Sequence, residues 1–260
     1  MAFDRKLGKS FKKVGESYHV GRKDYPKKLI EDIIKISDIN KGSLILDVGC
    51  GTGKSTIPFA RKGYKIIGID ISENMLEIAK KLSINYKNAQ YRQISFDKFS
   101  LSQNHFDLIL FGTAIHWLDP KKVYKKTCDL LKINGHLALF WEPIGSLCKK
   151  IRLLGMEKIF VRNCPNYPKN LPSDVTKTRI NGIMKTKSFA KPLIKKYKFI
   201  QKYSPEEFLS LINSYSWVIS LNKNKKNNLM QEVKMFLDKR ESLIKFQTEI
   251  YLIMAKRKFY

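Results

Sequence analysis

Three glycines at alternate positions form the sharpest chemical signal in this sequence. Gly49, Gly51 and Gly53 directly follow an apolar run that ends at Val48, and Asp70 closes the next apolar run. Glycines in a tight turn let the backbone approach a ligand closely, because no side chain intervenes. An acidic side chain at the end of the neighbouring strand can accept hydrogen bonds from both hydroxyls of a ribose. The spacing therefore predicts a site for a ligand that carries adenosine.

Other glycine-rich turns fit this segment less well. A phosphate-binding loop of the form GxxxxGK[ST] would share Gly53-Lys54-Ser55, but it needs glycine where Val48 stands. The dinucleotide fingerprint GxGxxG fits the first two glycines of the turn but lacks the third, at Lys54. A tight turn without any ligand is the plainest alternative, and the position of Asp70 argues against it.

Two side chains are candidates for acid–base catalysis on a bound substrate. His116 lies after the fourth apolar run, and Glu142 ends the fifth. His116 could serve as a general base or orienting group, or it could be a packed residue bonded to backbone; both interpretations stay open. Trp117 and Trp141 are expected in the core or in a pocket wall. The histidines lack metal-ligand spacing, so no metal site is expected.

Apolar runs alternate with amphipathic stretches before Pro143, and Pro26 begins the first expected helix. Nearly all-apolar strands are typical of a parallel sheet that is buried on both faces. The alternation therefore predicts an α/β fold with helices on both faces of the sheet. The expected strands lie near residues 44–48, 65–69, 89–94, 106–111 and 136–141, with helices up to 62, at 73–82 and at 120–131.

The alternation breaks after Pro143. Residues 144–196 are basic and weakly periodic, so we expect a cap or lid over the carboxyl edge of the sheet. Ser204-Pro205-Glu206-Glu207 is a capping box with proline at the first helical position, which predicts a helix through about residue 218. Residues 228–240 are expected to be helical, and 246–255 alternate as a last strand does.

The composition narrows the cellular setting and the partner. The net charge of +27 invites a nucleic-acid interpretation, but 41 of the 50 basic residues are lysine. Arginine is the usual base-reading residue, so we favour compositional bias with a preference for small anions. No run of about 18 apolar residues occurs, and the first ten residues lack an apolar segment, so neither a membrane span nor a secretory signal is expected. The four cysteines form no CxxC pair and are expected to be free thiols in the cytoplasm.

Two segments resemble class I S-adenosylmethionine-dependent methyltransferases. Residues 47–53, Asp-Val-Gly-Cys-Gly-Thr-Gly, resemble motif I of that family, and residues 68–72, Gly-Ile-Asp-Ile-Ser, resemble its motif II region. The family resemblance implies a Rossmann-like, doubly wound, mostly parallel seven-stranded sheet with a helical cap. It also implies a single domain, in which residues 1–40 are an arm and helix, 41–143 the cofactor-binding core, 144–196 the cap and 197–260 the part that completes the sheet.

Three further segments resemble one branch of that family. Residues 18–26 are similar to its YxxxRPxYP segment, 111–118 to its AxHW segment and 203–217 to its late helix. That branch includes trans-aconitate-type carboxyl methyltransferases and other small-molecule enzymes. The resemblance covers most of residues 18–143 and 197–258, and it is weakest over 144–196, where acceptor specificity is usually built.

The resemblance assigns one group of residues to the methionine and ribose parts of the cofactor. The three glycines of the turn would face the methionine part, and Asp70 would hold the ribose hydroxyls. Tyr18 and Arg22 would lie near the cofactor's carboxylate. Lys23 stands where the branch has proline, which loosens the match but leaves the arginine in place.

A second group would contact the adenine. Ile71 and Met75 would cover the ring by this resemblance. Ser95 takes the place where many members have an aspartate that meets the adenine amino group, so that contact departs from the family pattern. The backbone N–H of Phe96 would meet a ring nitrogen.

The expected activity is methyl transfer from S-adenosyl-L-methionine to a small anionic or polar metabolite, by direct in-line displacement, with S-adenosyl-L-homocysteine as product. A carboxylate acceptor needs no base because it is ionised at neutral pH, whereas a hydroxyl would need His116 or Glu142. An RNA methyltransferase is the alternative that the charge favours. The segment Gly112-Thr-Ala-Ile-His116 is not the [DN]PP[YFW] signature of base-amine methylation, however. A binding protein without catalysis is a third interpretation, against which the intact turn argues. The oligomeric state stays open.

Overall fold

The computed structural model describes residues 15–143, 145–168, 175–239 and 243–259. Most of the expected N-terminal arm, including the segment that bears on a secretory signal, lies outside these residues, and so do short parts of the expected cap. Among the helices of the described ranges, none is long and apolar enough to cross a membrane.

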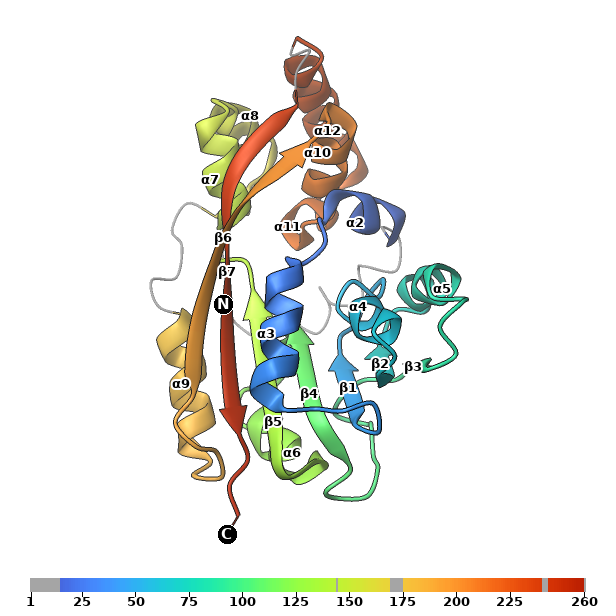
Figure 1. Ribbon diagram of the computed structural model, residues 1–260. Helices are drawn as coiled ribbons and strands as arrows, with labels where there is room; N and C mark the ends of the chain where they lie inside the picture. Colours follow the sequence, from blue (N-terminus) through green and yellow to red (C-terminus); the bar gives the residue numbers. More distant parts are fainter. Residues whose placement is uncertain (1–14, 144, 169–174, 240–242, 260) are drawn as a thin grey trace.

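A seven-stranded sheet forms the centre of the molecule and confirms the doubly wound, mostly parallel fold (Figure 1). The strands lie in the order β3-β2-β1-β4-β5-β7-β6. The first five of these pair in parallel, whereas β7 is antiparallel to both β5 and β6. Their bounds are β1 (Leu44–Val48), β2 (Lys65–Asp70), β3 (Ala89–Gln93), β4 (Phe106–Gly112), β5 (Leu131–Trp141), β6 (Leu193–Tyr203) and β7 (Ile244–Lys256).

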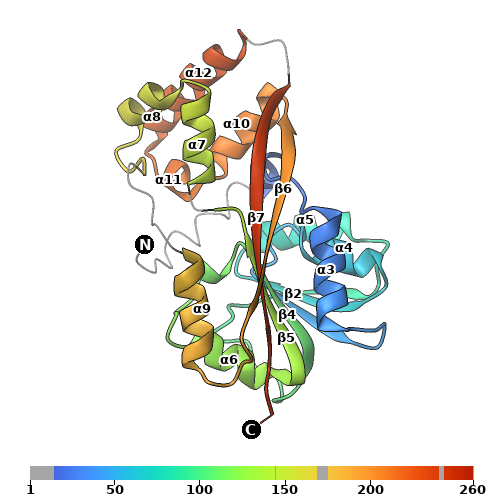
Figure 2. The ribbon, with the colours of Figure 1, turned by 60° about the vertical axis from the view of Figure 1, so that its left-hand side comes forward.

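Helices cover both faces of this sheet. They are α3 (Lys27–Ser37), α4 (Thr56–Arg61), α5 (Glu73–Leu82), α6 (Val123–Leu130) and α9 (Val175–Lys185). Successive strand residues point to opposite faces, so Ile45 packs in one core with α3 and α4, and Leu46 in another with α6 and α9. Figure 2 shows α3 and α4 on one side of the sheet and α6 with α9 on the other.

A cap is carried by a two-stranded ribbon. β6 pairs with β7 along its whole length, but β5 pairs with β7 only from Tyr251 onward, so the first half of β7 leaves the sheet together with β6 (Figures 1 and 2). The cap has a core of its own. Its helices are α7 (Ser146–Leu153), α8 (Glu157–Asn163), α10 (Pro205–Asn213), α11 (Ser216–Ile219) and α12 (Lys223–Leu237).

The residues that form the cap and those that complete the sheet differ from the expected ranges, 144–196 and 197–260. Within 144–196, α7 and α8 belong to the cap, but α9 packs on the sheet and β6 begins at Leu193. Conversely, the helices between 205 and 237 belong to the cap. A further short helix, α2 (Gly15–Gly21), lies within the expected arm. A helix belongs to the sheet or to the cap according to which of the two cores buries its apolar side chains. The periodicity of the sequence does not reveal this.

The local helix signals have mixed outcomes. The capping box at Ser204 is present, with both reciprocal hydrogen bonds and Pro205 in the first turn. The helix expected through about residue 218 instead ends at Asn213, and α11 is a separate turn. Ser72 directly precedes α5, but its hydroxyl makes no capping bond and lies buried.

Candidate functional site

The glycine turn connects β1 to α4 in a conformation that suits glycine. Gly49, Gly51 and Gly53 have φ of 68°, 54° and 84°, in the left-handed region that other residues rarely adopt. The Gly49 N–H donates to the Ile69 carbonyl at 2.8 Å, which anchors the turn to β2. A Cβ at Gly49 would lie 2.6 Å from the Ala114 Cβ, so the turn packs directly against the loop after β4.

Asp47 forms hydrogen bonds with the start of α4, next to the glycine turn. Its Oδ2 accepts hydrogen bonds from the Ser55 hydroxyl at 2.6 Å and the Thr56 hydroxyl at 2.7 Å. Its Oδ1 is buried and has no partner among the described residues. Burial raises the pKa of Asp47 to about 6, although both hydroxyls oppose that rise. This carboxylate therefore shapes the turn from within the core.

Asp70 ends β2 beside the turn. Its Oδ2 accepts from the Gly51 N–H and its Oδ1 from the Ser72 N–H, both at 2.9 Å. Burial raises the pKa of Asp70, and these backbone bonds counter the rise. Each carboxylate oxygen retains a free lone pair for a ligand hydroxyl. Ile71 is 37% exposed at the edge of the sheet, and Met75 is buried in the first turn of α5.

The segment after β3 lies along the same edge of the sheet. Ile94 donates its N–H to the Asp70 carbonyl at 3.0 Å, which brings this segment beside the end of β2. Ser95 begins a turn in which its carbonyl accepts from Lys98 and Phe99. The Phe96 ring is buried 5.6 Å from that of Phe111. The Phe96 N–H has no acceptor in the part of the chain that the structure describes.

Helix α2 connects the turn to the cap. His19 Nδ1 lies 3.2 Å from the Thr52 hydroxyl on the turn. Arg22 Nε donates to the Ser214 hydroxyl at 3.0 Å, and its guanidinium lies 4.0 Å from the Tyr215 ring centroid. Tyr18 is the side chain nearest to the Cβ position of Gly51, at 3.9 Å. The expected pair Tyr18 and Arg22 is thus brought to the glycine turn.

A cleft opens between the turn, α2 and the base of the cap. The sheet, the N-terminal helix and the cap all contribute polar side chains to the walls of this cleft. It is lined by Tyr18, Arg22, Lys23, Tyr25, Cys50, Thr52, Lys54, Ser55, Gly112, Thr113, Glu142, Gln201, Tyr203, Leu211 and Ile250.

Glu142 lines this cleft, where a buried lysine accompanies it. Lys150 Nζ donates to Gln201 Oε1 at 2.8 Å and lies 3.5 Å from Glu142 Oε1. The Ser146 hydroxyl donates to Glu142 Oε2 at 3.0 Å. Burial lowers the pKa of Lys150, and Glu142 counters that effect. The ammonium and the hydroxyl therefore fix the position of the Glu142 carboxylate at the cleft.

His116 lies in the turn after β4, η2 (Ile115–Trp117), exposed beside the glycine turn. Its ring is 4.6 Å from that of Trp117. Although its side chain reaches solvent, the protein packed around it, followed by the positive charges of Arg179 and Arg22, lowers the pKa of His116. The imidazole is therefore neutral at pH 7, where it can donate one hydrogen bond and accept another.

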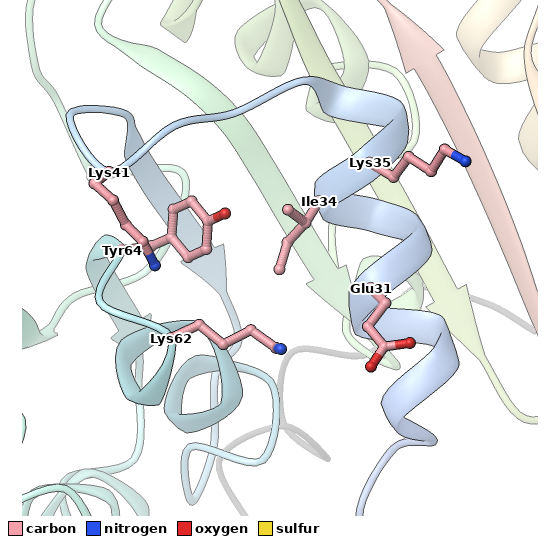
Figure 3. A pocket seen from close by; sticks show the side chains of 6 residues that line it. All are labelled: Glu31, Ile34, Lys35, Lys41, Lys62 and Tyr64. Atoms are coloured by element: carbon pink, nitrogen blue, oxygen red, sulfur yellow. The ribbon is translucent and has the colours of Figure 1, made fainter.

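A separate pocket lies at the opposite edge of the sheet (Figure 3). It is lined by α3, the loop before β1 and the end of α4, and Lys41 Nζ lies 4.3 Å from the Tyr64 ring centroid. β1 and β2 begin just after Lys41 and Tyr64, so this pocket is at the amino ends of the strands. It is therefore distinct from the cleft at the glycine turn.

Sequence reasoning missed several residues of the cleft. Lys150, Gln201 and Tyr203 come from the cap and from β6, for which no individual strand was expected. The alternation of Tyr197, Phe199, Gln201 and Tyr203 with lysines was the available signal for β6. Lys150 is one lysine among many, and only its 3% exposure distinguishes it.

Comparison with known proteins agrees with this geometry. Residues 46–139, which run from the glycine turn to β5, match the family described as "Methyltransferase domain". These residues therefore resemble a methyltransferase domain. A second family, described as "DNA methylase", matches residues 4–81 and overlaps the first at the glycine turn.

Curated relatives of this chain are named as methyltransferases, and the similarity covers between about half and nearly nine tenths of it. An "Uncharacterized methyltransferase" of Schizosaccharomyces pombe is 27% identical over 234 residues, which cover 87% of this chain and 86% of the relative. The "Probable S-adenosylmethionine-dependent methyltransferase CRG1" of Saccharomyces cerevisiae is 32% identical over 52% of this chain and 46% of its own. A "Malonyl-[acyl-carrier protein] O-methyltransferase" of Marinomonas is 27% identical over 56% of this chain and 55% of its own.

Solved structures have the same fold as this chain. The YcgJ protein of Bacillus subtilis superposes with a TM-score of 0.59 at 15% identity, covering 90% of this chain and 100% of its own. The [4+2]-cyclase SpnF superposes with a TM-score of 0.61 at 13% identity, covering 98% of this chain and 97% of its own. Because one of these is named as a cyclase, the fold alone does not fix the reaction.

Proposed function

We propose that this methyltransferase transfers a methyl group from S-adenosyl-L-methionine to a small, anionic or polar acceptor by direct in-line displacement, and so forms S-adenosyl-L-homocysteine. The observation that carries the proposal is the glycine turn with Asp70 on one side and α2 on the other. Asp70 accepts a hydrogen bond from the Gly51 N–H, while Tyr18 of α2 and Arg22, the residue after that helix, line the cleft.

The residues present fit such a cofactor. A Cβ at Gly51 would meet only Tyr18 within 4 Å, so the glycine leaves open space over the turn. Asp70 would hold the ribose hydroxyls, and Ile71 and Met75 would flank the adenine. The Phe96 N–H, which has no acceptor within the described ranges, would bond to an adenine nitrogen. Ser95 would contribute at most a hydroxyl to the adenine edge.

The charged end of the cleft suits the cofactor's carboxylate. Arg22 faces the cleft from α2, and its bond to Ser214 and its stacking on Tyr215 leave the guanidinium with donors to spare. A carboxylate that accepts from such a guanidinium gains a charge-assisted bond. Tyr18 beside it would close the turn from above.

When bound, the cofactor supplies a methyl group that its positively charged sulfur already activates. The chain's own task is to hold the acceptor atom in line and to exclude water. A carboxylate acceptor needs no base. For a hydroxyl acceptor, neutral His116 would orient the hydroxyl and accept its hydrogen bond, with Glu142 as the second candidate.

The relatives and the cleft both support a small anionic acceptor. The Marinomonas relative is named as an O-methyltransferase of a malonyl group, an acidic substrate. Arg22, Lys23 and Lys150 bring positive charge to the cleft and to its buried base. The resemblance to trans-aconitate-type enzymes points to the same class of acceptor.

Methylation of a nucleic acid is the second candidate, because of the match to a DNA methylase family and the net charge of +27. The sequence has no two adjacent prolines, so it lacks the Pro-Pro signature of base-amine methylation throughout its 260 residues. A small acceptor therefore remains the function that the residues support best.

Calorimetric titration with S-adenosyl-L-homocysteine tests the proposal. The wild type should bind, and Asp70→Asn should weaken binding by about 1.5–3 kcal/mol, the scale of lost hydrogen bonds to a charged group. Asp238→Asn, at the exposed end of α12, is the matched control and should bind as the wild type does. Absence of binding by the wild type would end the proposal, and a preference for NAD or ATP would revive the other glycine motifs.

A further inference from the structure

One arginine lies buried on the side of the sheet that carries α6 and α9. Arg179, in the middle of α9, is 6% exposed, and its guanidinium lies 3.7 Å from the centroid of the Trp141 ring. Trp141 in turn stacks on Tyr251 of β7, with centroids 5.8 Å apart. The cation therefore rests on a rigid aromatic floor at the end of β5.

No carboxylate of the described residues forms an ion pair with this cation. Nη1 of Arg179 is buried and has no hydrogen-bond partner among the described residues. Burial lowers its pKa to about 10, and the group that offsets this is the phenol of Tyr124, not a carboxylate. Arg179 therefore stays protonated at neutral pH. A buried charge without a partner is costly, and stacking on an aromatic ring recovers only part of that cost.

The position of Arg179 relates it to the methyl-transfer site. Trp141 is the last residue of β5, and the next residue, Glu142, lines the cleft. His116, in the turn after the neighbouring parallel strand β4, experiences the charges of both Arg179 and Arg22. That turn begins beside Ala114, which packs against Gly49. His116 thus lies within electrostatic reach of Arg22 at the cofactor cleft and of Arg179 at the end of β5.

We propose that Arg179 binds an oxyanion group of the methyl acceptor, a carboxylate or a phosphate, through its unpartnered Nη1. The inference rests on the proposed function and adds the part of the site that selects the acceptor. The planar guanidinium supplies two parallel N–H donors, which match the geometry of either oxyanion. Its Trp141 floor fixes the direction of these donors, and His116 lies on the side where the atom to be methylated would be held.

A purely structural role makes the opposite prediction for stability. If Arg179 served only to hold α9 on the sheet, Arg179→Met would lower the melting temperature, because the stacking would be lost. If Arg179 instead serves to bind an anion, Arg179→Met keeps an apolar side chain of similar length and removes a buried positive charge. The melting temperature should then stay the same or rise, as is common when a strained functional group is replaced.

The test is an NMR titration of the full chain loaded with S-adenosyl-L-homocysteine, at constant ionic strength. The sequence has three tryptophans, so the indole N–H signal of Trp141 can be assigned with Trp141→Phe. Succinate and inorganic phosphate are the two probes, and succinamide is the uncharged control. One of the two anions should shift the Trp141 signal in the wild type, and which one does so distinguishes a carboxylate from a phosphate acceptor.

Arg179→Met should weaken that binding at least tenfold while binding of S-adenosyl-L-homocysteine changes less than threefold. Lys185→Gln, which removes a charge from the exposed face of the same helix, should leave both unchanged. Three results would each overturn the proposal. Arg179→Met could bind the anion as tightly as the wild type does, the wild type could show no response to either anion, or Arg179→Met could fail to fold. If the wild type does not bind S-adenosyl-L-homocysteine at all, that result would instead count against the proposed function.

Discussion

Two aspartates on neighbouring strands have different environments. Asp70 accepts two backbone N–H bonds at the edge of the sheet, where a ligand can reach it. Asp47 lies fully buried, with one oxygen bonded to two hydroxyls and the other without a partner in the described part of the chain. Each residue belongs to one of the two segments that resemble family motifs, but the contacts of Asp47 are with the turn and the start of α4.

Asp47 should make the protein less stable as the pH rises. Because its pKa is about 6 in the folded state and about 3.8 when unfolded, folding favours the protonated form. Its stabilising contribution is present below about pH 4 and is lost as the pH rises through about 6. Asp47→Asn keeps an acceptor for both hydroxyls and removes this loss. Relative to the wild type, the variant should gain about 2 kcal/mol of unfolding free energy between pH 4.5 and pH 7.5.

Urea unfolding of both proteins at the two pH values measures this difference. Comparing the variant with the wild type at each pH removes the contribution of the other titrating groups. An identical difference at pH 4.5 and pH 7.5 would show that Asp47 is already charged in the folded state at low pH, contrary to this account.

At the scale of elements, α2 is the contact through which the cap reaches the glycine turn. Its last residue, Gly21, packs so closely on α10 that a Cβ would lie 2.2 Å from the Leu211 nitrogen. That neighbour is backbone and cannot rotate away. Gly21→Ala should therefore displace α2, with Tyr18 and Arg22, at a cost of about 1–3 kcal/mol in stability. Affinity for S-adenosyl-L-homocysteine should fall with it.

Gly15→Ala on the same helix is the matched control. A Cβ there would meet only the Ile78 Cδ1 atom closely, at 2.9 Å, and this is the far end of a flexible side chain. Thermal unfolding and calorimetry should show Gly15→Ala close to the wild type and Gly21→Ala impaired in both. Equal behaviour of the two variants would mean that the contact between α2 and α10 does not support the cofactor site.

Much of the cofactor side could be predicted from sequence, because its signals are local. Gly49, Gly51 and Gly53 require positive φ, and Asp70 follows at a fixed distance at the end of the next strand. The capping box at Ser204 is equally local, since its hydrogen bonds span four residues. Such features depend on neighbouring positions in the chain, so residue types alone reveal them.

The acceptor side could not be predicted, because its contacts join distant parts of the chain. Arg22 meets Ser214, and Arg179 meets Trp141. Nothing in the sequence around Arg179 distinguishes it from other basic residues on a weakly amphipathic helix. Only packing of α9 on the sheet shows that this charge is buried, with Nη1 unbonded within the described ranges.

At the scale of the whole molecule, the net charge of +27 will attract any polyanion. Binding to RNA or DNA therefore decides nothing about the acceptor. Methyl transfer from labelled cofactor should be measured at near-physiological salt, where nonspecific phosphate contacts are weakened. We expect label in a low-molecular-mass metabolite extract and not in total cellular RNA or DNA. Label at a defined nucleotide, with none among the metabolites, would make the basic surface functional and refute the small-acceptor proposal.

The order of the strands also bears on how this protein is made. β7 follows all the other strands of the sheet in the chain but lies between β5 and β6, and β6 pairs with β7 alone. On the ribosome, the five parallel strands can pair as they emerge, whereas β6 has no neighbour until residues 244–256 have left the exit tunnel. During that interval the edge of β5 is open to pairing with other chains. The cell must therefore protect a nascent chain whose cofactor turn is already formed but whose cap cannot yet dock.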